Sequence, residues 1–105
     1  MELDVMQRLL LLHILPKEGD ITMVRILRKL REDLSFTEEE HQKLNLRTEG
    51  PALVWDDKTY TKNVEIGLKA REMIVASLNR LNEQKKLTEE FLSLWEVFIE
   101  AGSVS

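Results

Sequence analysis

The chain alternates between stretches with helical spacing of apolar residues and short polar connections, and this pattern predicts about five helices. The first covers residues 2 to 14, where apolar side chains occupy most of the circumference, as in a buried helix. Pro16 ends it, because proline disfavours helical backbone at the preceding residue. The second covers residues 21 to 34, begins at the N-cap Asp20 and has one apolar stripe facing the core. The stripe consists of Met23, Leu27, Leu30 and Leu34.

The third helix starts with a strong capping signal. Thr37 and Glu40 have the spacing of a capping box, in which each side chain accepts a hydrogen bond from the backbone N–H of the other. Glu38 and His41 also have the Glu-x-x-His spacing of di-metal helical bundles, but such a site needs two of these motifs. The single motif favours a capped helix start over a metal site. The other histidine, His13, is assigned to the core or to an interface.

Between residues 45 and 57 the apolar spacing changes from helical to alternating. Gly50 and Pro51 interrupt the alternation and indicate a turn, so we predict a short two-stranded hairpin. A lone hairpin is marginal in water and must pack against the helices. Trp55 is the predicted anchor, because its large apolar surface can be buried there.

Two further helices follow the hairpin. The fourth is predicted over residues 61 to 84, and the fifth starts at Thr88 and ends near Gly102, with Leu87 and Leu92 at the positions of a hydrophobic staple. The predicted fold is therefore mostly α: a single domain over residues 1–105, with about five helices in a compact bundle and one hairpin between the third and fourth helices. Residues 102–105 are expected to form a disordered tail.

Composition excludes several kinds of chemistry. The apolar fraction of 43% and charged fraction of 32% are ordinary for a globular domain. The absence of cysteine excludes disulfides and thiolate sites, and the net charge of -4 disfavours indiscriminate binding to nucleic acid. The apolar run over residues 9 to 15 is too short to span a bilayer and lacks the basic start of a signal peptide. We therefore expect a cytoplasmic, acidic protein without membrane contact.

The sequence also lacks the motifs of common enzymes. Its four glycines are isolated, so no phosphate-binding loop is formed, and no serine lies in a nucleophile elbow. Carboxylates are numerous, but number alone does not identify a catalytic pair. We predict a protein that is not an enzyme and has no cofactor and no metal.

Two interpretations of function remain. The first is protein–protein binding with probable homo-oligomerisation, because two helices have apolar arcs wider than one neighbour needs; its candidate residues are Trp95, Phe98 and Met73. The alternative is a winged-helix-like DNA-binding regulator, since three helices precede the hairpin. The residues at the start of the third helix are acidic, which counts against this alternative. Its candidate phosphate contacts are Arg25, Arg28, Lys29 and Arg31.

Several segments together resemble a short, uncharacterised protein family carried by tailed phages and prophages. They are "LLLLHILPKEGDITMVRILRKLREDLSFTEEE", Trp55, "VEIGLKA" and "KLTEEFLSLWEVF", and the resemblance covers most of the chain. It implies no activity, and no functional residue can be carried over. It implies a bacterial host and the binding roles common among small phage proteins, which are connector, regulator or inhibitor of a host complex.

Overall fold

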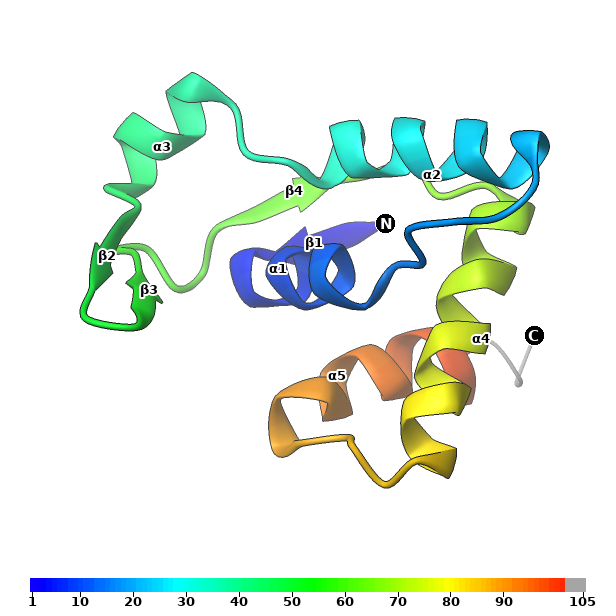
Figure 1. The fold of residues 1–105 in the computed structure, drawn as a ribbon. Coiled ribbons are helices and arrows are strands. Elements are labelled where there is room, and N and C mark those ends of the chain that lie inside the picture. The colour runs from blue at the N-terminus through cyan, green and yellow to red at the C-terminus, as the bar shows by residue number, and fades with distance from the viewer. Residues whose placement is uncertain (102–105) are drawn as a thin grey trace.

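The computed structural model describes residues 1–101 and shows a mostly helical chain with two small antiparallel sheets (Figure 1). The longer helices are α1 (Val5–Ile14), α2 (Ile21–Leu34), α3 (Glu38–Leu44) and α4 (Leu68–Glu83). The strands are β1 (Glu2–Asp4), β2 (Arg47–Glu49), β3 (Ala52–Val54) and β4 (Thr61–Asn63). The predicted mostly α class is confirmed. The tail predicted over residues 102–105 lies outside the described residues.

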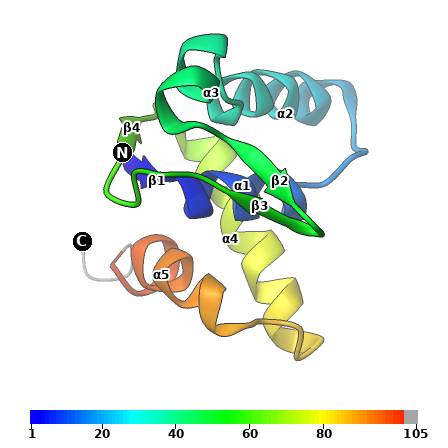
Figure 2. The ribbon, with the colours of Figure 1, turned by 90° about the vertical axis from the view of Figure 1, so that its left-hand side faces the viewer.

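The main hydrophobic core lies around α1. In Figures 1 and 2, α2 lies above this helix, α4 runs along one side and the C-terminal helical segment lies below. Each element contributes side chains to one cluster, including fully buried leucines from all four. These are Leu11, Leu34, Leu78 and Leu94. The broad apolar circumference of α1 is explained by this central position, because neighbours cover it on several sides.

A second, smaller core joins α3 and the β2–β3 hairpin to the start of α1. It consists of Val5, Leu44 and Trp55, with Trp55 9% exposed. The Lys58 ammonium lies 3.7 Å from the centre of the Trp55 ring and covers it by a cation–π contact. The prediction that Trp55 anchors this region is confirmed. The strands themselves are shorter than the predicted span of residues 45–57.

The sheet formed by β1 and β4 was not predicted. Leu3 lies opposite Lys62 in an antiparallel pair, and Leu3 is fully buried. The prediction of helix from residue 2 is wrong, because the side chain of Asp4 accepts a hydrogen bond from the backbone N–H of Gln7 at 2.7 Å and caps α1. The prediction of helix from residue 61 is also wrong. Residues 61–63 pair with β1, and α4 begins only after its N-cap Gly67.

The fifth predicted helix is not one regular α-helix. A 3₁₀ turn (Glu89–Phe91) leads into the short α5 (Leu92–Trp95), which continues as a π-helical turn (Glu96–Glu100). The backbone N–H of Ala101 donates to the Glu96 carbonyl at 2.7 Å across the wide π turn. Thr88 precedes the segment but makes no side-chain capping bond. The spacing of apolar residues predicts a helical segment here, but it does not distinguish 3₁₀ and π turns from a regular α-helix.

The other helix starts agree with the sequence. Asp20 caps α2 by accepting from the Met23 N–H at 2.9 Å. The capping box of Thr37 and Glu40 is formed in both directions, with donor–acceptor distances of 3.1 and 3.0 Å. Local side-chain-to-backbone bonds of this kind depend on only four residues, which is why the sequence predicts them well.

A buried ion pair connects α1 to α3. Arg8 is fully buried, and its guanidinium donates to both carboxylate oxygens of Glu40, at 2.7 and 3.1 Å. Arg8 also donates to the carbonyls of Leu34 and Ser35, at 3.0 and 2.6 Å. The guanidinium also lies 4.0 Å from the centre of the Phe36 ring. Arg8 thereby holds the end of α2, the connection after it and the start of α3.

Glu40 supplies the negative charge that offsets the free-energy cost of burying Arg8. Its carboxylate accepts from Arg8, from the Thr37 N–H and from the Tyr60 hydroxyl, which lies at 2.8 Å. Burial alone raises the pKa of Glu40, but these hydrogen bonds outweigh burial and lower the pKa from 4.5 to about 2. The same bond to Glu40, together with burial, raises the pKa of Tyr60. Glu40 is therefore ionised at neutral pH, and the hydrogen bonds of the pair offset the cost of burying it.

We expect Glu40 to make the stability of the fold pH dependent. Its folded pKa is below its ordinary value, so its contribution is complete above about pH 5 and is lost as pH falls toward the folded pKa of about 2. Glu40→Gln removes this proton uptake. The difference in free energy of unfolding between the wild type and Glu40→Gln should shrink by about 2 kcal/mol from about pH 6 to about pH 3. Urea denaturation followed by tryptophan fluorescence measures it.

Tyr60→Phe is the milder companion variant, because it removes one hydrogen bond to Glu40 and keeps the ion pair. It should lose roughly 1 kcal/mol at neutral pH and less at low pH. If the free energy of unfolding of the wild type and of both variants changed by the same amount with pH, the assigned role of Glu40 would be contradicted.

Candidate protein-binding surface

An apolar hollow of about 440 Å³ lies between the end of α4 and the C-terminal helical segment. Its apolar lining comes from Leu87, Phe91, Leu92 and Trp95. Phe91 is largely buried, whereas Leu92 is 57% exposed and Trp95 is half-buried. A leucine this exposed beside a concave apolar surface is available for contact with another molecule.

The backbone that forms the hollow is held by a Schellman motif at the end of α4. Lys85 has a left-handed conformation with φ of 58°, and its N–H donates to the Asn82 carbonyl at 3.0 Å. The N–H of Lys86 donates to the Leu81 carbonyl at 2.9 Å. This motif reverses the chain and sends Leu87 into the wall of the hollow.

The polar rim of the hollow is acidic. Glu89 and Glu100 line it together with Asn82 and Thr88, and the described lining includes no Lys, Arg or His. In the sequence, residues 87–101 contain four glutamates and no basic residue. The surface therefore combines an exposed apolar centre with negative charge at its edge, whereas the chain as a whole has mixed charge.

The predicted partner-binding residues lie in different places. Trp95 lines the hollow, as a contact residue should. Phe98 is only 2% exposed and belongs to the main core, so in this conformation it is not available to a partner. Met73 is half-buried and packs against the same core. Sequence reasoning missed the exposure of Leu92, because the staple pattern predicted that Leu92 would be covered by Leu87.

The basic residues of α2 do not form one unpaired face. Arg28 lies 3.4 Å from Glu32 and Lys29 lies 3.4 Å from Asp33, as their spacing predicted. Arg31 is half-buried and donates to the Pro16 carbonyl. Arg25 is exposed. Arg28, Lys29 and Arg31 thus have contacts within the chain, although the two exposed ion pairs contribute little energy.

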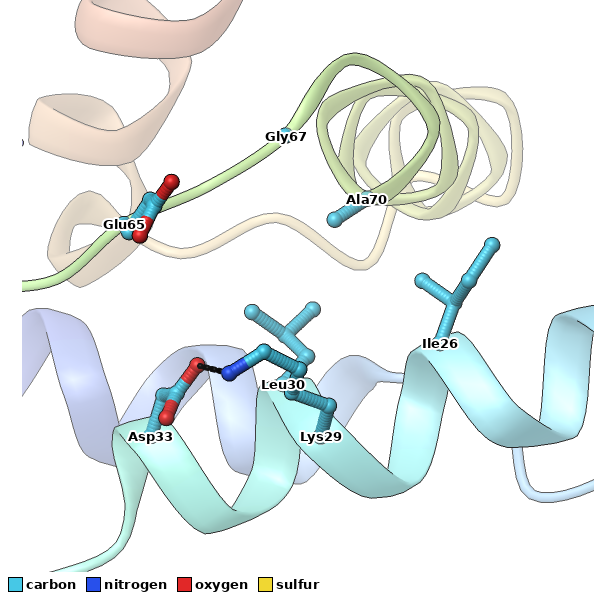
Figure 3. A pocket seen from close by; sticks show the side chains of 7 residues that line it. All are labelled: Ile26, Lys29, Leu30, Asp33, Glu65, Gly67 and Ala70. Atoms are coloured by element: carbon cyan, nitrogen blue, oxygen red, sulfur yellow. Dashed lines mark hydrogen bonds and ion pairs between the residues drawn. The ribbon is translucent and has the colours of Figure 1, made fainter.

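A second hollow, of about 250 Å³, lies between α2 and the start of α4. Figure 3 shows Ile26 and Leu30 of α2 facing Ala70, with the Lys29–Asp33 ion pair beside them. Leu30 and Ala70 are buried members of the main core. This hollow is smaller than the C-terminal one, and an ion pair within one helix borders it, so we do not treat it as the principal site.

The two histidines are both exposed. His13 is at the surface near the end of α1, so its assignment to the core is wrong. His41 lies edge-on to the Phe36 ring, with ring centres 6.4 Å apart, and Glu38 is exposed in the first turn of α3. Within residues 1–101, no group of three or more His, Asp or Glu side chains is placed to hold a metal ion.

Comparison of the chain with protein-family models, with curated proteins and with solved structures found no match. Among residues 1–101, no helix combines the length and the hydropathy that crossing a bilayer requires. The candidate site accordingly rests on geometry alone.

We expect Lys85→Gly to stabilise the end of α4 and with it the hollow. Glycine adopts the left-handed conformation without the steric cost that Lys85 bears, so the free energy of unfolding should rise by roughly 0.5 kcal/mol after the entropy loss of glycine is counted. Thermal denaturation measures the change. Lys85→Ala, which removes the charge and keeps the Cβ atom, should give no such gain, and an equal gain in both variants would contradict the explanation.

Proposed function

We propose that the protein acts by protein–protein binding, without catalysis, and that the C-terminal hollow is its contact surface. The proposal places it among small phage- or prophage-type interaction proteins of the bacterial cytoplasm, as a connector, a regulator or an inhibitor of a host complex. The observation that carries it is the 57% exposure of Leu92 beside Trp95 at a hollow of about 440 Å³.

The physical argument concerns what a partner would gain at this surface. Burying the exposed part of Leu92 is worth about 1 kcal/mol or more, and a half-buried tryptophan adds an anchor of the kind that dominates binding energy in protein interfaces. The hollow gives such an anchor a concave surrounding from which water is excluded on contact. Glu89 and Glu100 at the rim would select the charge of the partner's edge.

The DNA-binding alternative receives no support from the geometry. Helix α3 begins with the exposed Glu38 and Glu39, and Arg28 and Lys29 of α2 already pair with acidic residues of their own helix. A helix that brings carboxylates toward phosphates opposes binding. DNA binding therefore enters only as an outcome of the test.

Leu92→Ser should weaken the capture of a host protein about tenfold, because it removes roughly 1.4 kcal/mol of buried apolar contact. Tagged wild type and variant are used as bait in a nuclease-treated lysate of the bacterial host, with quantitative mass spectrometry as the measurement. Leu92 is exposed, so the variant should keep the stability of the wild type.

Leu53→Ser is the matched control, since Leu53 is 38% exposed on the hairpin and belongs to a different surface. It should capture the same protein as the wild type. Equal loss in both variants, or equal retention in both, would overturn the assignment of the hollow. Retention that depends entirely on nucleic acid would instead support the DNA-binding alternative.

A further inference from the structure

We propose that the outer face of α4 is a self-complementary surface through which two copies of the chain pack antiparallel. This face is separate from the C-terminal hollow and carries a shallow groove of about 410 Å³. Leu68 is 73% exposed there, the highest exposure among the large apolar side chains of the described residues. The groove is lined by Leu68, Arg71, Glu72, Val75, Ala76 and Asn79.

The spacing of these residues is that of a helix pair. Leu68, Glu72, Val75 and Asn79 follow one another at intervals of four, three and four residues, which keeps them on one side of the helix. Figure 1 shows α4 along one side of the molecule, and Leu68, Glu72 and Asn79 of this helix are exposed. The opposite face of α4 packs into the main core, and Val75 at the edge of the groove is half-buried and contacts this core as well.

In one antiparallel register, charged residues of α4 lie opposite residues of opposite charge on the second copy. If Ala76 lies opposite Ala76 of a second copy, Glu72 comes opposite Arg80, since each is four residues from Ala76. In the same register Lys69 comes opposite Glu83, each seven residues from Ala76. All four charged side chains are exposed, and the two-fold axis repeats both opposite-charge pairs.

Neighbouring arrangements are less favourable. Moving the axis between Val75 and Ala76 removes both attractive pairs, because Glu72 then lies opposite Asn79 and Lys69 opposite Asn82. A parallel pair places every charge opposite its own copy, which is repulsive throughout. The charge pattern therefore identifies the occupant as an antiparallel second copy.

The side chains at the axis fit close approach. Ala76 is exposed and small, so two helices can come near one another at this point. Leu68 would lie near the last turn of the other α4, where the aliphatic stems of Arg80 and Glu83 can cover it. The existing Lys69–Glu72 contact of 3.5 Å joins side chains that are 75% and 56% exposed, so it is too weak to prevent rearrangement.

An interface of one helix per chain belongs to the small class, and we expect a weak, rapidly exchanging dimer. Sedimentation equilibrium of the full chain over roughly 10 to 500 µM at low salt should show a mass rising above 12.3 kDa toward twice that value. High salt should weaken the association, because exposed charge pairs are screened. A monomer over the whole range would overturn the proposal.

Charge exchange tests the register. Arg80→Glu and Glu72→Arg should each weaken dimerisation about tenfold, since each turns two attractive pairs into repulsive ones. The double variant Glu72→Arg/Arg80→Glu should recover the wild-type dissociation constant to within a few-fold. A general loss of folding cannot produce recovery in the double variant. A change of net charge would shift association in opposite directions in the two single variants, so weakening in both is the result that identifies the pairing.

Two control variants make the same changes of charge on other surfaces. Arg25→Glu on α2 and Glu38→Arg on α3 alter exposed residues outside α4 and should leave the dimer unchanged. A dimer that responds equally to the controls, or that fails to respond to Arg80→Glu, would overturn the α4 register. Leu92→Ser should not affect the dimer, so failure of this proposal and failure of the proposed function are separately visible.

Discussion

A guanidinium without access to solvent holds α3 against α1, beside the small hydrophobic core that joins the same elements. Arg8 projects from α1 and reaches Glu40 on α3 as well as the carbonyls of Leu34 and Ser35. Removing a charge from water costs several kcal/mol, and the cost is offset only when its donors meet acceptors in good geometry. This requirement restrains the conformation of residues 34–40, because Leu34, Ser35 and Glu40 supply the acceptors of Arg8.

The same network supports the smaller of the two hydrophobic clusters. Val5, Leu44 and Trp55 form a small core that would bury little apolar surface by itself. The ion pair and the Tyr60 hydrogen bond lie beside this core. Polar and apolar contacts therefore hold the same elements together. The larger cluster around α1 needs no such support, since helices on several sides cover it.

Most local features were predictable from the sequence, although the cap at Asp4 was missed, and distant pairings were not predictable. The caps at Asp20 and Thr37 depend on residues three positions apart, and the buried stripe of α2 follows from helical spacing. The pairing of β1 with β4 joins residues about 60 positions apart, and their short polar strands carry no alternating pattern to reveal it. Arg8 appeared as one more polar position in an apolar helix, because nothing near it in sequence identifies Glu40 as its partner. The exposed Leu92 was missed for a related reason: spacing shows which residues share a face but not what covers that face.

The β1–β4 pair has a consequence for synthesis on the ribosome. Residues 2–4 are synthesised well before their partner strand, which ends at Asn63. At a typical elongation rate of about 5–20 residues per second, the N-terminal strand waits several seconds before it can pair. During that interval the leucine-rich α1 also lacks α4 and the C-terminal segment that cover it in the finished protein. The packing of α1 can therefore be completed only when α4 and the C-terminal segment have also left the ribosome.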